Sequence, residues 1–128
     1  MENKKILIID DDKKLTDMYS SKFNASGFQT TVARNAQEAK KLFEERLKPE
    51  IILLDIVMPG QNGVEFLNEI RKNNLGGNPP IMMLTNLDQS EDLNEGIMEK
   101  IDGYFVKTEV TPGIMVAKVN ELLEKRKK

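Results

Sequence analysis

The chain has 128 residues with a formal net charge of −2, and 39% of its residues are hydrophobic and 31% charged. This size and composition are ordinary for one globular domain, and they exclude a strongly basic nucleic-acid surface and a membrane-spanning segment. Cysteine and histidine are absent, which excludes disulfides, zinc–thiolate sites and imidazole catalysis, so any bound metal must have oxygen ligands. We therefore expect residues 1–128 to form a single cytoplasmic domain.

The first half of the chain alternates short apolar runs with amphipathic segments, which predicts alternating strands and helices. The expected elements are a strand at 4–10, a helix at 12–26, a strand at 28–33, a helix at 35–48 and a strand at 50–55. Gly27 suits the C-terminal end of the first helix. Asn35 and Glu38 form a capping-box pattern at the start of the second helix, and Pro49 is expected to end it.

The second half of the chain continues the alternation after a Gly/Pro-rich loop at 75–80. The expected elements are a helix at 62–74, a strand at 81–84, a helix at 87–101, a strand at 103–107 and a helix from 112 to about 125. The helix at 87–101 is the weakest of these, because Gly96 inside it costs roughly 1 kcal/mol relative to alanine. Thr111 followed by Pro112 is a favourable helix start.

Alternation of this kind predicts an α/β fold, a doubly wound five-stranded parallel sheet with five helices on its two faces. Ligands of such sheets bind beyond the carboxyl ends of the strands, where the strand order reverses. The residues that directly follow each apolar run are therefore the candidates for a functional site.

Acidic residues follow two of the expected strands. Asp10, Asp11 and Asp12 follow the first strand, and Asp55 ends the third. If these strands are neighbours, their carboxylates converge, and two carboxylates about 4 Å apart repel by roughly 4 kcal/mol at an effective dielectric constant near 20. A divalent cation relieves this repulsion, and Mg²⁺ prefers such oxygen ligands. Asp12 also fits the simpler role of N-cap of the first helix.

Thr85 and Lys107 follow the fourth and fifth expected strands. Alone, the threonine would be read as a turn-capping hydroxyl and the lysine as a solvated surface residue. Together with a metal on the same edge, they supply the hydroxyl and the positive charge that a phosphoryl group requires around its oxygens.

Four motifs of this sequence resemble the receiver domain of chemotaxis-type two-component response regulators. They are DDD after ILII, LLDIVMPGQNG at 53–63, MMLTN at 82–86 and GYFVK at 103–107, in the family order across nearly the whole chain. The resemblance implies a flavodoxin-like fold with strand order 2-1-3-4-5.

The resemblance also implies roles for the acidic residues. Asp55 matches the phosphoacceptor, whose carboxylate attacks a phosphohistidine of a partner kinase. Asp11 matches the direct Mg²⁺ ligand and Asp10 the acid that holds the metal through water. Asp55 itself and the backbone carbonyl of Val57 match the remaining protein ligands.

Three further residues match the family's switch. Thr85 matches the hydroxyl that hydrogen-bonds the phosphoryl group, and Lys107 matches the lysine that pairs with it. Tyr104 matches the aromatic residue that turns inward when Thr85 moves. The chain would then be a regulator, not an enzyme, although it assists its own phosphorylation and dephosphorylation.

The resemblance implies protein partners for the chain. They are a histidine kinase or phosphotransfer protein and a downstream output protein or domain. The last two helices and the last strand are the usual partner or dimer face. We expect no direct contact with nucleic acid and no membrane association.

Two features depart from the family pattern. Thr108 stands where proline usually follows the lysine, so we expect a trans bond after Lys107. Val57 and Leu87 are apolar where some relatives carry polar groups near the attacking water, which predicts a slowly hydrolysed aspartyl phosphate.

Three other functions fit parts of the pattern. A haloacid-dehalogenase-like phosphatase would use Asp10 as nucleophile and Asp12 as its second acid, but it expects threonine where Lys14 stands. A receiver-like module could signal without phosphate. A flavodoxin-like electron carrier is disfavoured, because only 5% of the residues are aromatic.

Overall fold

The computed structural model of the chain describes residues 4–86 and 93–126. Its five strands form one parallel sheet in the order β2-β1-β3-β4-β5, as predicted. The strands are β1 (Lys4–Ile9), β2 (Phe28–Ala33), β3 (Ile51–Asp55), β4 (Ile81–Thr85) and β5 (Gly103–Val106). The helices are α1 (Lys13–Ala25), α2 (Ala36–Glu44), α3 (Gly63–Asn73), α4 (Glu95–Met98) and α5 (Pro112–Arg126), with a 3₁₀ turn, η1 (Leu75–Gly77).

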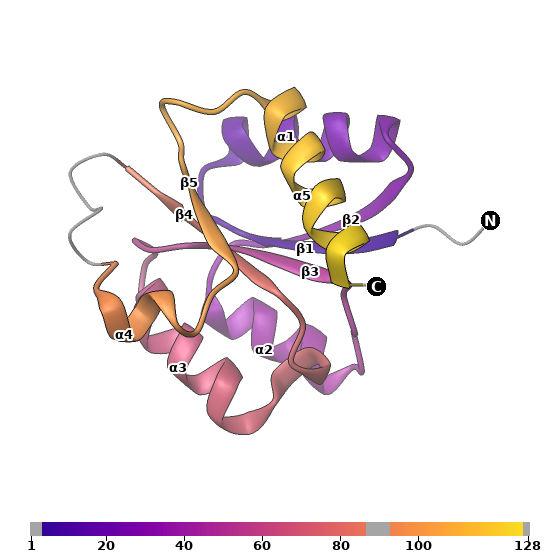
Figure 1. Cartoon of the computed structure of the whole chain (residues 1–128). Helices are drawn as coiled ribbons and strands as arrows, with labels where there is room; N and C mark the ends of the chain where they lie inside the picture. Colours follow the sequence, from indigo (N-terminus) through magenta and orange to yellow (C-terminus); the bar gives the residue numbers. More distant parts are fainter. Residues whose placement is uncertain (1–3, 87–92, 127–128) are drawn as a thin grey trace.

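The helices cover both faces of the sheet, with α1 and α5 on one side and α2, α3 and α4 on the other (Figure 1). Alternate residues of each central strand point to opposite faces. Ile6 and Ile8 join the core under α1 and α5, whereas Leu7 and Ile9 join the core under α2 and α3. The apolar runs that predicted strands therefore reflect burial on both faces.

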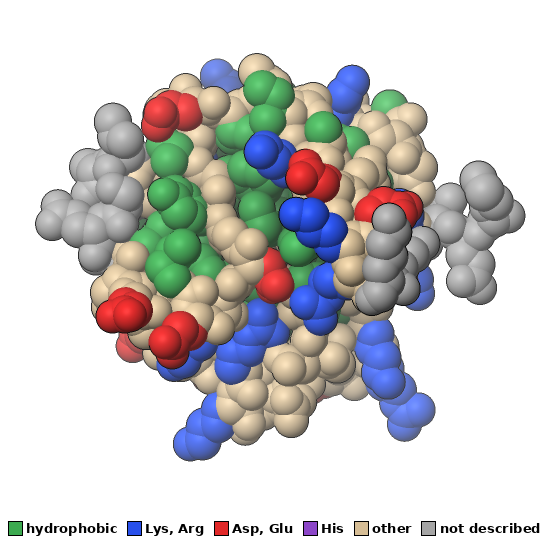
Figure 2. All heavy atoms as spheres, in the orientation of Figure 1, with side chains coloured by type: hydrophobic (Ala, Val, Ile, Leu, Met, Phe, Trp, Pro, Cys, Tyr) green, Lys and Arg blue, Asp and Glu red, His purple; other side chains and the backbone are tan. Residues whose placement is uncertain are grey.

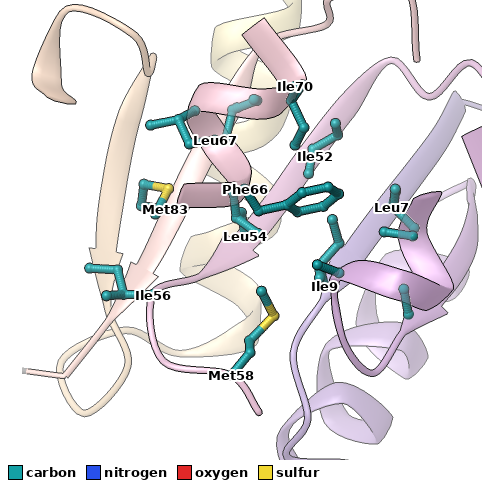
Figure 3. Packing of buried hydrophobic residues seen from close by; sticks show 14 of the residues in the cluster. Leu7, Ile9, Ile52, Leu54, Ile56, Met58, Phe66, Leu67, Ile70 and Met83 are labelled. Carbon is teal, nitrogen blue, oxygen red and sulfur yellow. The ribbon is translucent and has the colours of Figure 1, made fainter. Parts of the chain in front are cut away.

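Phe66 of α3 lies at the centre of the core on the α2 and α3 side. Its side chain is fully buried, and it lies against Ile9, Ile52 and Leu54 of the neighbouring strands (Figure 3). This packing holds α3 directly beneath β3, so the loop between β3 and α3 is anchored at both ends.

The predicted helix starts are confirmed by capping hydrogen bonds. The side chain of Asp12 accepts a hydrogen bond from the Leu15 amide at 3.1 Å. Asn62 and Glu65 form a complete capping box at the start of α3. The Thr111 hydroxyl accepts from the Ile114 amide at 3.2 Å. These caps satisfy helix N–H groups that have no partner within the helix.

Helix α2 ends earlier than predicted, at Glu44 and not at residue 48. Arg46 adopts the left-handed conformation with φ 73°. The Arg46 amide donates to the Phe43 carbonyl and the Leu47 amide to the Leu42 carbonyl, which is the Schellman arrangement. The apolar spacing of Leu42 and Leu47 suggested that the helix continues to Leu47. Instead, the hydrogen bond from the Leu47 amide to the Leu42 carbonyl ends α2.

Helix α4 is shorter than the predicted segment 87–101, of which 87–92 lie outside the described residues. It begins after Asn94, whose side chain accepts from the Ile97 amide at 3.0 Å, and it ends at Met98. The Lys100 carbonyl accepts a hydrogen bond from Arg71 of α3 instead of continuing the helix. Leu93, Ile97 and Ile101 do face the core, so the predicted apolar face is confirmed.

Hydrophobic side chains reach the surface on the face that carries β5 and α5 (Figure 2). Met98, Tyr104 and Ile114 are exposed members of α4, β5 and α5. None of the helices between residues 4 and 126 that the structure describes has the length and hydrophobicity of a bilayer span.

Candidate functional site

The register of the sheet brings the four strand ends together at one edge. Ile9 pairs with Leu54, so Asp10 follows β1 beside Asp55 at the end of β3. Asp55 pairs with Leu84, the residue before Thr85 at the end of β4, and Lys107 directly follows the last residue of β5. The predicted site residues of these strands therefore lie together at the carboxyl edge of the sheet. This is the edge where parallel α/β domains bind their ligands.

Three of the four predicted acids form a cluster. Asp10, Asp11 and Asp55 each place a carboxylate oxygen within 4.8 Å of the others. Asp10 and Asp55 are buried, with 0% and 3% exposure, whereas Asp11 is exposed. Asp12 is not a member, because its carboxylate caps α1. The cluster thus has two buried carboxylates and one at the solvent boundary.

The turn between β1 and α1 is held by Asp10 itself. Its Oδ1 accepts a hydrogen bond from the Asp12 amide at 2.9 Å, and its own amide donates to the Ala33 carbonyl at 3.0 Å. The short Asx-type turn explains why the chain places consecutive aspartates here. The first shapes the turn, the second faces solvent and the third starts the helix.

Lys107 lies between the two buried carboxylates. Its Nζ is 2.8 Å from Asp10 Oδ2 and 3.1 Å from Asp55 Oδ1. The Lys107 amide donates to the Thr85 carbonyl at 2.8 Å, so the lysine backbone is tied to the end of β4. The described residues contain no cis peptide bond, which confirms the trans bond before Thr108. The lysine therefore reaches both acids without the usual proline.

Burial raises the pKa of Asp55 to about 7, with the Asp10 charge adding to the shift and Lys107 opposing it. Burial alone would lower the pKa of Lys107, but its contacts with Asp10 and Asp55 outweigh burial and raise that pKa. Burial and the Asp10 charge thus shift Asp55 toward its neutral form. Positive charge beside this group favours the carboxylate form.

Gly63 allows α3 to approach Asp55 closely. A Cβ atom on Gly63 would overlap the Asp55 carbonyl oxygen and lie 2.8 Å from Ile56 Cα. The Gly63 amide donates to the Ile56 carbonyl at 2.6 Å. The motif at 53–63 contains this glycine, but no local pattern in the sequence explains it. The reason is steric, since no other residue fits against the end of β3.

The remaining predicted residues surround the cluster. The Thr85 hydroxyl is buried and donates to the Asn86 carbonyl at 2.9 Å. Tyr104 is 43% exposed and Val57 is 53% exposed, and Leu87 lies outside the described residues. Thr85 is thus engaged with backbone, and Tyr104 lies at the surface.

Two residues near the cluster were not anticipated. Arg34 follows β2 and donates from Nη1 to the Thr16 hydroxyl at 2.6 Å. Tyr19 of α1 is buried, and burial raises its pKa to about 12. The Lys107 charge opposes this shift and the Asp10 charge adds to it. No sequence motif marks either residue, because both belong to the site only through the packing of α1 and β2 on β1.

The acidic cluster fits a divalent cation by charge and by unused ligand capacity. Three carboxylates and one ammonium have a formal charge of −3 + 1 = −2. Asp10 Oδ2 is buried and, although paired electrostatically with Lys107, has no hydrogen bond of ordinary geometry. Asp10, Asp11 and Asp55 could therefore hold Mg²⁺, which prefers oxygen ligands and retains water.

These features define a doubly wound α/β domain with a potential cation site at the carboxyl edge of its parallel sheet. The family model for the response regulator receiver domain matches residues 6–120. The chain belongs to this family, which confirms the resemblance seen in its motifs.

Individual relatives agree with this assignment. The phosphate regulon transcriptional regulatory protein PhoB of Pseudomonas aeruginosa is 30% identical over 125 residues, which cover 98% of this chain and 54% of PhoB. The DNA-binding response regulator MtrA of Mycobacterium tuberculosis is 31% identical over 121 residues, covering 94% of this chain and 51% of MtrA. The chain spans about half the length of these curated relatives.

A solved structure agrees over its full length. The receiver domain of the Francisella response regulator 1452 is 35% identical and has a TM-score of 0.83, covering 98% of this chain and 100% of that domain. The chain is thus similar to receiver domains of two-component signalling. MtrA is named as DNA-binding, so the comparisons do not support the expected absence of nucleic-acid contact.

Proposed function

We propose that this domain takes a phosphoryl group from a histidine kinase or phosphotransfer protein onto Asp55 and changes conformation to control a partner or output domain. The observation that carries the proposal is the convergence of Asp10, Asp11, Asp55 and Lys107 at one edge of the sheet. In this assignment Asp11 would be a direct ligand of Mg²⁺ and Asp10 would hold it through water, and Asp55 and the Val57 carbonyl would be the other ligands.

Asp55 is the nucleophile of the proposed reaction. One carboxylate oxygen forms a bond to phosphorus as the phosphorus–nitrogen bond of the donor phosphohistidine breaks, and the electron pair of that bond returns to the imidazole. Lys107 lies 3.1 Å from Asp55 Oδ1 and supplies positive charge to the transferring oxygens. Bound Mg²⁺ would supply the rest of the charge stabilisation that such a transfer needs.

Thr85 and Tyr104 form the proposed switch. The phosphoryl group adds negative charge and three acceptor oxygens. The Thr85 hydroxyl exchanges its bond to the Asn86 carbonyl for one to a phosphoryl oxygen. Tyr104, now at the surface of β5, turns inward behind it. A local charge thereby shifts the equilibrium between two conformations of the same face.

The face built from α4, β5 and α5 is the proposed contact surface for a second copy or an output domain. Its exposed hydrophobic side chains include Met98, Tyr104 and Ile114, and Figure 2 shows hydrophobic side chains at the surface of this face. Because Tyr104 belongs both to this face and to the switch, its movement would change the surface that a partner contacts.

The rival phosphatase function receives less support. It requires Asp12 as a second catalytic acid beside Asp10, whereas the Asp12 carboxylate is bound to the amide of Leu15 at the start of α1. Asp12 also lies outside the acidic cluster.

The proposal is tested by incubating the chain with Mg²⁺ and acetyl phosphate and locating the modified residue by mass spectrometry. One phosphoryl group on Asp55 is expected, with loss of modification in EDTA and in Asp55→Asn. Asp12→Asn is the matched control, because asparagine also caps a helix, and it should be modified normally. Modification of Asp10, or catalytic turnover of a phosphate ester, would contradict the proposal.

A further inference from the structure

The guanidinium of Arg34 connects the end of β2 to the turn that carries the acidic cluster. Its Nη1 donates to the Thr16 hydroxyl at 2.6 Å and to the Asp10 carbonyl at 3.5 Å. Thr16 and Asp10 are both fully buried, and Arg34 is half-buried. The Arg34 side chain, which comes from the β2–α2 connection, therefore contacts both sides of the β1–α1 connection. These are the end of β1 and the first turn of α1.

The backbone beside Arg34 adds to this connection. The Ala33 carbonyl accepts a hydrogen bond from the Asp10 amide at 3.0 Å, so Asp10 is held at its N–H by Ala33 and at its carbonyl by Arg34. The Arg34 amide donates to Glu38 Oε1 at 2.8 Å, which anchors the arginine to the start of α2. Asp10 is thus fixed from the β2 side independently of its own side chain.

Arg34 does not neutralise the cluster directly. Among residues 4–86 and 93–126 its guanidinium has no ion pair with a carboxylate. The carboxylates of Asp10 and Asp55 are paired with Lys107 instead. The arginine contacts the backbone of Asp10 and a hydroxyl, which are contacts suited to fixing geometry.

We propose that Arg34 is a positioning residue that fixes the turn between β1 and α1 and thereby raises the affinity of the acidic cluster for a divalent cation. This inference rests on the proposed function, because it concerns the same cation. Groups behind metal ligands orient them, and their loss typically weakens metal binding about 10- to 100-fold.

The sign of the effect separates positioning from simple electrostatics. Arg34 is positively charged, so by Coulomb's law its removal should strengthen the binding of a nearby cation. If Arg34 positions the turn, its removal should weaken that binding. The two mechanisms therefore predict opposite changes in the Mg²⁺ dissociation constant.

The experiment is titration of the folded chain with Mg²⁺ by calorimetry, comparing the parent with Arg34→Ala, Arg34→Lys and Thr16→Val. Arg34→Ala is expected to raise the dissociation constant about tenfold. Arg34→Lys keeps the charge but not the fork of donors and should also bind more weakly than the parent. Lys41→Ala is the matched control, because Lys41 is exposed on α2, and its dissociation constant should stay within about twofold.

Hydrogen exchange in EDTA provides a readout without the cation. The amides of Asp11, Asp12 and Lys13 should exchange faster in Arg34→Ala than in the parent, and at the parent rate in Lys41→Ala. A purely structural role would lower thermal stability in EDTA but leave Mg²⁺ affinity unchanged. Thr16→Val removes the hydroxyl that accepts from Arg34 and also donates to the Lys13 carbonyl at 3.1 Å, but it leaves Arg34 in place, so the test can still be made if Arg34→Ala fails to fold.

The outcomes distinguish this inference from the proposed function. Equal or tighter Mg²⁺ binding by the Arg34 and Thr16 variants, in a parent that binds Mg²⁺ and is phosphorylated on Asp55, would overturn the inference alone. A parent that binds no Mg²⁺ would overturn the inference and the proposed function together.

Discussion

The acidic cluster depends on residues that differ in their solvent exposure and contacts although they are adjacent in sequence. Asp10 is buried and paired with Lys107, Asp11 is exposed, and Asp12 caps a helix. Their different environments follow from the turn after β1, in which each successive side chain points in a new direction. The position of each aspartate in the turn therefore determines the solvent exposure and the contacts of its carboxylate.

The close approach of α3 to β3 predicts that Gly63→Ala is severely destabilising. The new Cβ would overlap the Asp55 carbonyl oxygen and lie 2.8 Å from Ile56 Cα, and both contacts are with backbone that cannot rotate away. We expect the free energy of unfolding to fall by about 3 kcal/mol or more, measured by urea denaturation.

Gly96→Ala is the matched control for this substitution. Among residues 4–86 and 93–126, the nearest atom to its Cβ would be in the Asn94 side chain, at 3.4 Å, and alanine is favoured over glycine within a helix by up to about 1 kcal/mol. A stability unchanged by Gly63→Ala would mean that α3 can shift away from β3, and the steric account of this glycine would be wrong.

At the scale of elements, the sequence predicted the strands more accurately than the ends of the helices. Strand positions followed from apolar runs, and the caps of α1 and α5 from Asp12 and Thr111. The end of α2 was missed because Arg46 is not a residue that marks a left-handed C-terminus. The short α4 was missed because its carbonyl partner, Arg71, comes from another helix, a tertiary contact that no local pattern reports.

The Schellman ending of α2 predicts that Arg46→Gly stabilises the protein. Arg46 has φ 73°, a conformation that costs a residue with a Cβ roughly 1–2 kcal/mol, whereas glycine adopts it freely. Part of this gain is lost to the greater freedom of glycine in the unfolded chain. We expect a net increase of about 0.5 kcal/mol in the free energy of unfolding, measured by urea denaturation.

Arg46→Ala separates the backbone effect from loss of the exposed side chain. It should be no more stable than the parent, because alanine retains the left-handed penalty. If both variants changed stability equally, the arginine side chain and not its backbone conformation would be responsible.

At the scale of the whole molecule, the fold assembles a site that no single segment contains. Asp10, Asp55, Thr85 and Lys107 come from four strand ends, and the parallel register places them at one edge. The sequence predicted this convergence because apolar runs fixed the strand ends. It did not predict that Lys107 contacts both buried carboxylates, or that Arg34 supports the turn from behind. Those contacts depend on side-chain directions that only the packed molecule determines.

The buried carboxylates predict an unusual dependence of stability on pH in the absence of divalent cations. The pKa of Asp55 is raised from 3.8 to about 7, so between these values the folded state retains a proton that the unfolded state has lost. Stability should therefore fall as pH rises from about 4 to about 7, and level off above that. At 1.36 kcal/mol per pKa unit, this contribution is at most about 4 kcal/mol. Lys107 does not contribute in this window, because its raised pKa affects stability only above its ordinary range.

The measurement is urea unfolding in EDTA at several pH values from 4 to 8, comparing the parent with Asp55→Asn. The difference between the two removes the titration of all other carboxylates, and the parent should lose stability relative to the variant as pH rises. Mg²⁺ should raise the free energy of unfolding of the parent more at pH 8 than at pH 5, because the cation binds the ionised carboxylates. Parallel curves for parent and variant would show that Asp55 is already ionised at acidic pH, with Lys107 sufficient to hold its charge.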